Sequence, residues 1–156
     1  MTDASGQSGR VVVRRVLPAS REQVFAAWTD ADSMRDWMCP SDAHTAEAWL
    51  DPRAGGSYRI VMRDGAGTYE HTGQYLIVEP PSRLVFTWIA ASTANRPTIV
   101  TVELAPHAQG CELVLTHERL PEGTVVERYR GGWGYIAERL AAFLARVRAP
   151  KEERHA

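Results

Sequence analysis

An alternation of apolar and polar residues over positions 47–118 constrains the fold more than any other feature of the sequence. It is clearest where Val100, Val102 and Leu104 alternate with polar neighbours. A period of two is typical of antiparallel strands with one buried and one wetter face. Turn signals divide the region, and the Asp-Gly pair at 64–65 is a good hairpin signal. The predicted strands cover residues 44–50, 57–63, 68–78, 83–91, 98–105 and 111–118.

A long helical segment follows these strands. Its apolar residues recur at helical spacing. The stripe consists of Tyr129, Trp133, Ile136, Leu140, Phe143, Leu144 and Val147. Gly131 and Gly132 interrupt the segment early, each at about 1 kcal/mol relative to alanine. We therefore expect a kink or a fresh helix start at these glycines.

The first forty residues add a strand and two short helices. Residues 11–16 form a β-branched strand. Ser20 and Gln23 have the spacing of a capping box, which predicts a helix beginning there. Met34 and Trp37 share one face of a second short helix.

The resulting order is one strand, two helices, six strands and a long helix. Such a sheet can bury the helix stripe economically only by curling around it, so we expect an α+β fold with a curved antiparallel sheet. A chain of 156 residues suits a single domain. We expect a flexible tail over residues 1–9, the domain over 10–148 and a charged tail over 149–156.

Several short motifs lie within this order: residues 24–29 (VFAAWT), 34–37 (MRDW), 51–58 (DPRAGGSY), 73–75 (GQY), 80–88 (PPSRLVFTW) and 132–133 (GW). Together, over roughly residues 11–144, they resemble the activator-of-heat-shock-protein-ATPase-like branch of the START-like (SRPBCC) superfamily. The resemblance implies the helix-grip fold, β-α-α-β6-α, and suggests a link to the stress response. It does not single out a function, because the superfamily includes lipid and hormone binders, polyketide cyclases, aromatases and co-chaperone domains.

Composition disfavours several classes of partner. The formal net charge is -1 without a basic stripe, so nucleic-acid binding is not expected. The N-terminus lacks a signal-peptide pattern, and no apolar run is long enough to span a membrane, which makes a cytoplasmic location the default. Cys39 and Cys111 sit beside apolar residues and are expected to be free, buried thiols.

Sequence motifs of catalysis are absent. Neither a Gly-x-Ser-x-Gly elbow nor a His-Glu-x-x-His helix occurs, and the five histidines lack metal-ligand spacing. We therefore expect no metal and no cofactor. By alternation, His71 and His117 face the concave side of the sheet. A buried, hydrogen-bonded role is the simplest interpretation, while ligand orientation and acid–base catalysis stay open.

We expect an apolar cavity near the start of the long helix, with the two short helices as its lid. The expected wall consists of Trp37, Trp49, Tyr58, Ile60, Met62, Tyr69, His71, Tyr75, Trp88, His117, Tyr129 and Trp133. An apolar wall with a few polar groups is usual for small-molecule pockets. The first hypothesis is therefore binding of a small hydrophobic or aromatic molecule. The alternatives are a cyclase- or hydrolase-like enzyme using the cavity histidines and tyrosines, and a co-chaperone-like interaction domain.

Three apolar residues lie on the outer face of the predicted sheet: Val61, Leu76 and Val85. Exposed apolar patches often mark interfaces. They make a homodimer a further expectation.

Overall fold

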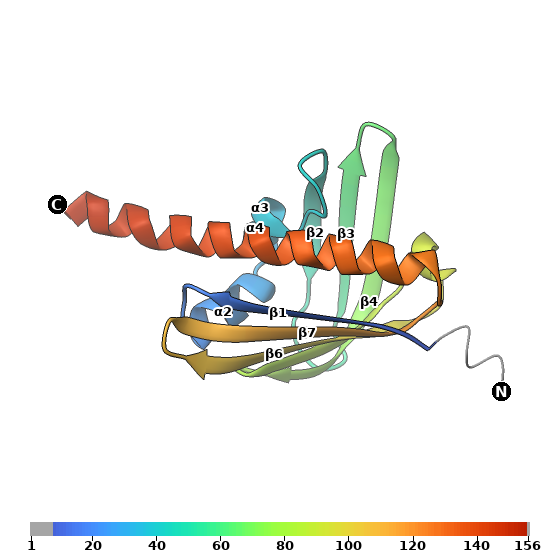
Figure 1. The fold of residues 1–156 in the computed structure, drawn as a ribbon, viewed down its shortest axis with the longest axis horizontal. Coiled ribbons are helices and arrows are strands. Elements are labelled where there is room, and N and C mark those ends of the chain that lie inside the picture. Colours follow the sequence, from blue (N-terminus) through green and yellow to red (C-terminus); the bar gives the residue numbers. More distant parts are fainter. Residues whose placement is uncertain (1–7, 156) are drawn as a thin grey trace.

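The computed structural model describes residues 8–155 and has an α+β architecture (Figure 1). The expected order of one strand, two helices, six strands and a long helix is confirmed. The elements are β1 (Gly9–Leu17), α2 (Arg21–Trp28), α3 (Ala31–Trp37), β2 (Thr45–Leu50), β3 (Ser57–Asp64), β4 (Gly67–Glu79), β5 (Arg83–Trp88), the 3-10 helix η1 (Ala91–Thr93), β6 (Thr98–His107), β7 (Gly110–Leu120) and α4 (Thr124–His155).

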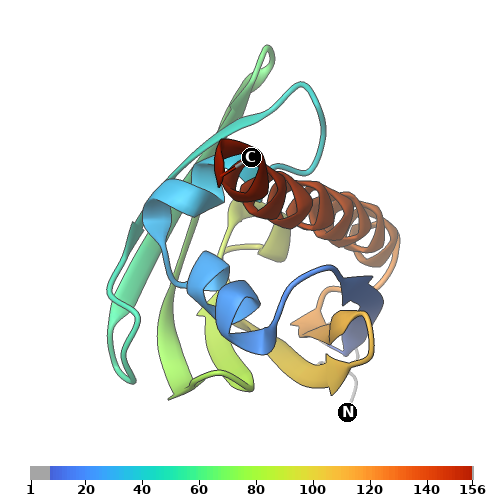
Figure 2. The same cartoon turned by 90° about the vertical axis from the view of Figure 1, so that its left-hand side faces the viewer.

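The seven strands form one antiparallel sheet in the order β1-β7-β6-β5-β4-β3-β2. Strands β1, β6 and β7 run along α4, whereas β3 and β4 cross it steeply (Figure 1). Viewed along α4, the sheet forms an arc around the helix (Figure 2). This is the helix-grip arrangement that the helix stripe and the alternating strands predicted.

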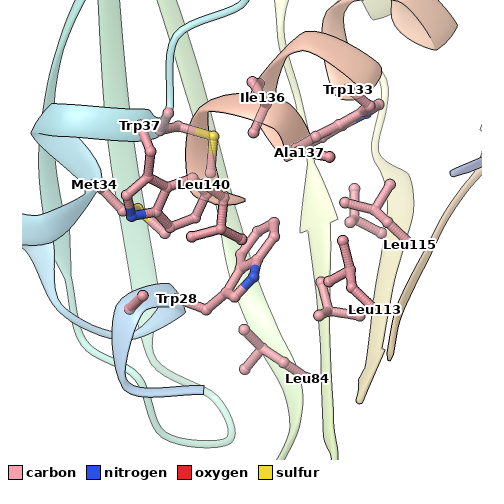
Figure 3. Close-up of a cluster of buried hydrophobic side chains, with 14 of the residues drawn as sticks. Trp28, Met34, Trp37, Leu84, Leu113, Leu115, Trp133, Ile136, Ala137 and Leu140 are labelled. Carbon is pink, nitrogen blue, oxygen red and sulfur yellow. The ribbon is translucent and has the colours of Figure 1, made fainter. Parts of the chain in front are cut away.

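The core lies between the concave face of the sheet and α4 (Figure 3). Trp28 of α2, Trp37 of α3 and Trp133 of α4 are each at most 2% exposed. The rings of Trp28 and Trp37 meet edge to face, with centroids 4.9 Å apart. Burying a large apolar side chain contributes about 1.5–3 kcal/mol, so these contacts hold the short helices and the long helix on the sheet.

Local sequence signals explain how α2 begins. The Ser20 Oγ accepts a 3.2 Å hydrogen bond from the Gln23 backbone N–H. The Gln23 Oε1 accepts a 2.9 Å bond from the Ser20 backbone N–H. The predicted capping box is therefore confirmed, and it fixes the direction in which the chain leaves β1.

Two glycines occupy positions that exclude larger residues. Gly55 has a φ of 87°, in the left-handed region that favours glycine. At Gly73, a Cβ atom would lie 2.0 Å from the Thr87 carbonyl oxygen and 2.7 Å from the Tyr58 ring. Glycine at 73 therefore lets β4 approach β5 closely.

The prediction that a new helix starts at Gly131 and Gly132 is wrong. The helix continues from Thr124 to His155 without a break. Buried residues on the same face, such as Trp133, Ile136 and Leu140, pack against the sheet directly after the glycines. This packing outweighs the low helix propensity of two glycines.

The prediction of an apolar patch on the outer face of the sheet is also wrong. Val61 and Val85 are 2% and 6% exposed, and Leu76 is the one exposed member of the three. Val61 lies on the same face as the paired side chains of Arg59 and Glu70, which lie over the sheet beside it. Long charged side chains can cover apolar surface with their aliphatic stems.

Regular secondary structure reaches close to both ends of the described residues. Residues 149–155, which the sequence suggested as a charged tail, continue the backbone of α4. Of the expected N-terminal tail, residues 1–7 lie outside the described residues, and β1 already begins at Gly9.

Within residues 8–155, no helix is both long enough and apolar enough to cross a membrane. Cys39 and Cys111 are free and buried, as expected.

Candidate functional site

A pocket of about 400 Å³ opens between α4, β4, the end of β5 and the segments that precede β2 and contain η1. Its lining comes from four separate stretches of the chain. They are residues 40 and 44, residues 62 and 68–71, residues 88, 90–92 and 95, and residues 125, 128–129, 132–133 and 136. The pocket therefore lies along the N-terminal half of α4, where the sequence predicted a cavity.

The structure brings half of the expected wall residues together. Those that line the pocket are Met62, Tyr69, His71, Trp88, Tyr129 and Trp133. The others that face the concave side are packed in the core away from it: Trp37, Tyr58, Ile60, Tyr75 and His117. Trp49 lies on the opposite face of the sheet.

Trp49 was assigned to the wrong face. It pairs directly with Arg59 across the β2–β3 ladder, and paired residues share a face. Its side chain is 49% exposed, and the Arg59 guanidinium lies 4.9 Å from the indole centroid. The inward-facing residues of β2 are instead Ala46, Ala48 and Leu50.

The short helices form a plug at the other end of the core instead of a lid. Trp28 of α2 and Met34 of α3 line the same void of about 10 Å³ as Tyr58 and Tyr75. No residue of α2 or α3 lines the larger pocket, where Pro40 and His44 of the following segment form the rim. Trp37, expected at the lid, is fully buried.

The floor of the pocket is aromatic. The rings of Trp88 and Trp133 lie 5.1 Å apart between centroids. Met62 and Ile136 add aliphatic surface to the same wall, and both are buried by neighbouring side chains. A flat apolar or aromatic molecule is the kind of occupant such a wall suits.

His71 is the buried polar residue of the pocket wall, and one of its ring nitrogens lacks a partner. Its side chain is 7% exposed, and its ring lies 4.7 Å from that of Trp88 between centroids. Burial lowers the pKa of His71 to about 4, so the imidazole is neutral at pH 7. Nδ1 is enclosed without a hydrogen-bond partner among the described residues. Nε2 is therefore the ring nitrogen that remains accessible to a ligand.

A second polar position is formed by Tyr129 and Ser92. The Trp88 indole N–H donates a 3.0 Å hydrogen bond to the Tyr129 hydroxyl. The hydroxyl groups of Tyr129 and Ser92 lie 2.6 Å apart. Burial raises the pKa of the Tyr129 phenol, against the opposing effects of these hydrogen bonds and of Arg128. Tyr129 therefore keeps its proton at neutral pH.

His117 lies behind the pocket wall, and both of its ring nitrogens form hydrogen bonds within the protein. Its Nδ1 accepts a 2.9 Å hydrogen bond from the Trp133 indole N–H. Its Nε2 therefore carries the proton and donates to the Thr98 hydroxyl at 2.7 Å. Thr98 in turn donates to the Trp88 carbonyl at 2.6 Å. The geometry supports the buried, hydrogen-bonded interpretation of this histidine.

A polar cluster at the rim was missed by the sequence analysis. His44 lies with Nε2 3.3 Å from a carboxylate oxygen of Asp64 and with Nδ1 2.7 Å from the Ser41 hydroxyl. The Tyr69 hydroxyl donates to Asp64 at 3.1 Å. The available signal was the hairpin register, because Thr45 pairs with Arg63 and so places His44 opposite Asp64.

This cluster fastens the rim and does not present a nucleophile to the pocket. Desolvation would raise the pKa of Asp64, but hydrogen bonds from the N–H groups of Ala66 and Gly67 and from Tyr69 bring it below its usual value. Asp64 is therefore an anion that anchors His44 and Tyr69. The Ser41 hydroxyl accepts from the Ala43 N–H and does not line the pocket.

Within the described part of the chain, no group of three or more histidine, cysteine or acidic side chains is placed to hold a metal ion.

Comparison with known proteins identifies a family over most of the chain. The family model described as Activator of Hsp90 ATPase homolog 1-like protein matches residues 18–145. No curated protein matches the chain significantly.

Solved structures share the fold over nearly their full length. A protein from Chromobacterium violaceum is 27% identical, with a TM-score of 0.79, and the match covers 86% of this chain and 95% of that one. The AHSA1 protein of Silicibacter pomeroyi is 28% identical, with a TM-score of 0.75, covering 87% and 97%. A Rhodobacter sphaeroides protein is 26% identical, with a TM-score of 0.75, covering 90% and 95%.

Proposed function

The chain belongs to the family of Activator of Hsp90 ATPase homolog 1-like proteins, and we propose that it binds a small apolar or aromatic molecule in the pocket beside Trp88 and Trp133. Its START-like fold supports a ligand-binding or a co-chaperone-like domain. We favour ligand binding over a co-chaperone-like role because of the properties of the pocket.

The single observation that carries the proposal is His71. A polar side chain that is 93% buried normally has its hydrogen bonds satisfied, because an unsatisfied group costs about 1–3 kcal/mol. Nδ1 of His71 has no hydrogen-bond partner among the described residues, and the residue borders a pocket large enough for a ligand. An occupant that hydrogen-bonds the accessible Nε2 would stabilise this buried ring, although Nδ1 would stay without a partner.

The shape of the wall favours a flat, largely apolar occupant. Removing apolar surface from water contributes about 25 cal/mol per Å². Association costs at least about 4 kcal/mol, so a useful ligand must bury most of its apolar surface. Trp88 and Trp133 offer ring surfaces for this contact, while His71 and Tyr129 offer orientation.

Native mass spectrometry of the protein purified without denaturant tests the proposal directly. We expect a retained small molecule, released on denaturation and identifiable by its mass. A probe such as 2-acetylnaphthalene, followed by its effect on tryptophan fluorescence, gives a second readout.

Two adjacent glycines provide a matched pair of variants. Gly132 lines the pocket, and a Cβ atom there would lie 3.6 Å from the Pro40 Cβ. Gly131 is exposed, with nothing within 4 Å of a Cβ atom. Gly132→Leu should therefore fill the pocket mouth and weaken probe binding at least about tenfold, because the ligand loses buried area. Gly131→Leu should leave binding unchanged, although it introduces the same residue into the same helix.

Equal probe binding by both variants would exclude the pocket as the binding site. The co-chaperone-like interpretation of the family fold would then be the better one.

A further inference from the structure

We propose that the ligand is a small aromatic carboxylic acid, with its carboxylate held by the Tyr129–Ser92 hydroxyl pair and Arg128, and with its ring on Trp88 and Trp133. The inference rests on the proposed function and names the class of ligand. It follows from counting the donors and the charges that face the pocket.

The Tyr129–Ser92 pair has one hydroxyl hydrogen too many for its protein partners. The two groups hold two hydrogens, and their mutual 2.6 Å bond uses one of them. The Trp88 indole N–H donates its own hydrogen to the Tyr129 oxygen, so the indole does not accept a hydrogen bond from either hydroxyl group. Whichever hydroxyl donates within the pair, the hydrogen of the other has no acceptor among the described residues. The pocket therefore presents one hydroxyl donor that requires a water or a ligand acceptor.

The charges of the pocket lining leave a positive excess. Glu70 is paired with Arg59 at 2.5 Å, and His44 lies 3.3 Å from Asp64. Arg128 lines the pocket and forms no ion pair with any carboxylate in the described part of the chain. Its neighbour on the helix, Arg130, is paired with Glu127 instead. The guanidinium of Arg128 is thus the uncompensated charge at this wall.

The free donor and the free charge border the same pocket. Tyr129 follows Arg128 directly in α4, and the positive charge of Arg128 is one of the influences that oppose the burial-driven rise of the Tyr129 pKa. A carboxylate has two oxygens that accept hydrogen bonds and a charge that complements a guanidinium. A carboxylate can therefore accept the free hydroxyl hydrogen and pair with the Arg128 guanidinium at the same time. A neutral carbonyl can only accept the hydroxyl hydrogen.

His71 is an independent indication that the pocket is built for a polar aromatic molecule. Its buried imidazole, whose Nδ1 has no partner, packs on Trp88, the same indole that donates to Tyr129. A hydroxyl substituent on the ligand ring can either donate to or accept from this imidazole. An aromatic acid that carries such a substituent therefore reaches the accessible polar groups of the wall: Nε2 of His71, the hydroxyl pair and Arg128.

The test compares two probes of nearly the same shape, 2-naphthoic acid and 2-naphthamide, by titration against the full chain at pH 7. We expect the acid to bind more tightly than the amide. Arg128→Gln should weaken the acid about tenfold and change the amide by less than about twofold, because the variant removes the charge-assisted contact alone. Arg128→Lys, which keeps the charge, should retain part of the preference. Raised salt should weaken the acid selectively.

Arg130→Gln is the matched control. Arg130 is exposed on the same helix, as Arg128 is, but it does not line the pocket. It should leave both affinities unchanged. If the two probes bind equally and Arg128→Gln has no effect, the carboxylate assignment is overturned while the proposed function stands. If neither probe binds, the result counts against the pocket function and therefore against both proposals.

Discussion

The indole N–H of Trp133 on α4 donates a 2.9 Å hydrogen bond to Nδ1 of His117 on β7. Through Thr98 on β6, the same histidine is connected to the backbone of Trp88 on β5. One neutral imidazole thereby joins the long helix to three neighbouring strands. Because both tryptophans line the pocket, this chain of hydrogen bonds sets the geometry of its floor.

Truncating Trp133 should destabilise the protein severely. Trp133→Ala removes a side chain that is 2% exposed, and we expect the free energy of unfolding to fall by about 3–5 kcal/mol. Trp133→Phe keeps an aromatic ring but leaves His117 Nδ1 without a donor. It should cost about 1–3 kcal/mol from the unsatisfied nitrogen, beyond the smaller loss of packing. Urea denaturation of the variants measures both. A near-unchanged midpoint for Trp133→Ala would contradict the burial of this residue.

Trp49 provides the contrasting case on the outer face. Its cation–π contact with Arg59 is half-exposed, so Trp49→Ala should lower the free energy of unfolding by only about 0.5–1 kcal/mol. Probe affinity should not change. Loss of binding in this variant would show that Trp49 contributes to the pocket after all.

Stability should fall as the pH is lowered through the slightly acidic range. Burial lowers the pKa of His71 to about 4, and burial with the nearby His71 lowers that of His117 to about 3, from an ordinary value of 6.5. Below about pH 6.5, therefore, these two histidines become protonated in the unfolded chain while they stay neutral in the folded protein. The loss begins there and continues to about pH 4 for His71 and about pH 3 for His117. Each histidine contributes at most about 1.4 kcal/mol per pH unit.

The His71→Phe variant isolates one of these contributions. It retains an aromatic ring beside Trp88 but has no site for the proton. Denaturation midpoints between pH 7 and 4 should fall less steeply for this variant than for the parent protein. Parallel profiles would mean that His71 has the same pKa in the folded and unfolded states.

Replacing Gly131 by alanine should stabilise the protein. The residue is exposed within an unbroken helix and has open space around it. We expect Gly131→Ala to raise the free energy of unfolding by up to about 1 kcal/mol, measured by urea denaturation. A decrease would indicate that the helix departs from ordinary geometry at this position.

The alternating pattern could predict the architecture and the face of the sheet on which most residues lie. It could not predict whether a residue lies at the open end of the core or at the end filled by the short helices. Tyr58 and Tyr75 do point to the concave side, yet they lie at the end that α2 and α3 fill. His71 and Tyr69, on the same strand as Tyr75, lie at the open end. The difference depends on how far the short helices extend over the sheet, which tertiary packing decides.

The errors and omissions have specific physical causes. Trp49 is a large apolar residue on an edge strand whose inward positions are two alanines and Leu50, so its size misled the assignment of faces. The donor pair of Ser92 and Tyr129 joins residues far apart in the sequence. No local pattern connects them, and only the folded chain shows that one of their hydrogens is unmatched.

The pairing of β1 with β7 imposes an order of events during synthesis. In the sheet order, β1 lies at the edge and has β7 as its neighbour, with Gly9 opposite Leu120. β1 is translated before the other strands of this sheet, so it must wait for nearly all of them before its backbone groups find their strand partner. At about 5–20 residues per second, this delay lasts several seconds. During that interval the β-branched segment of β1 is exposed to chaperones and to other nascent chains.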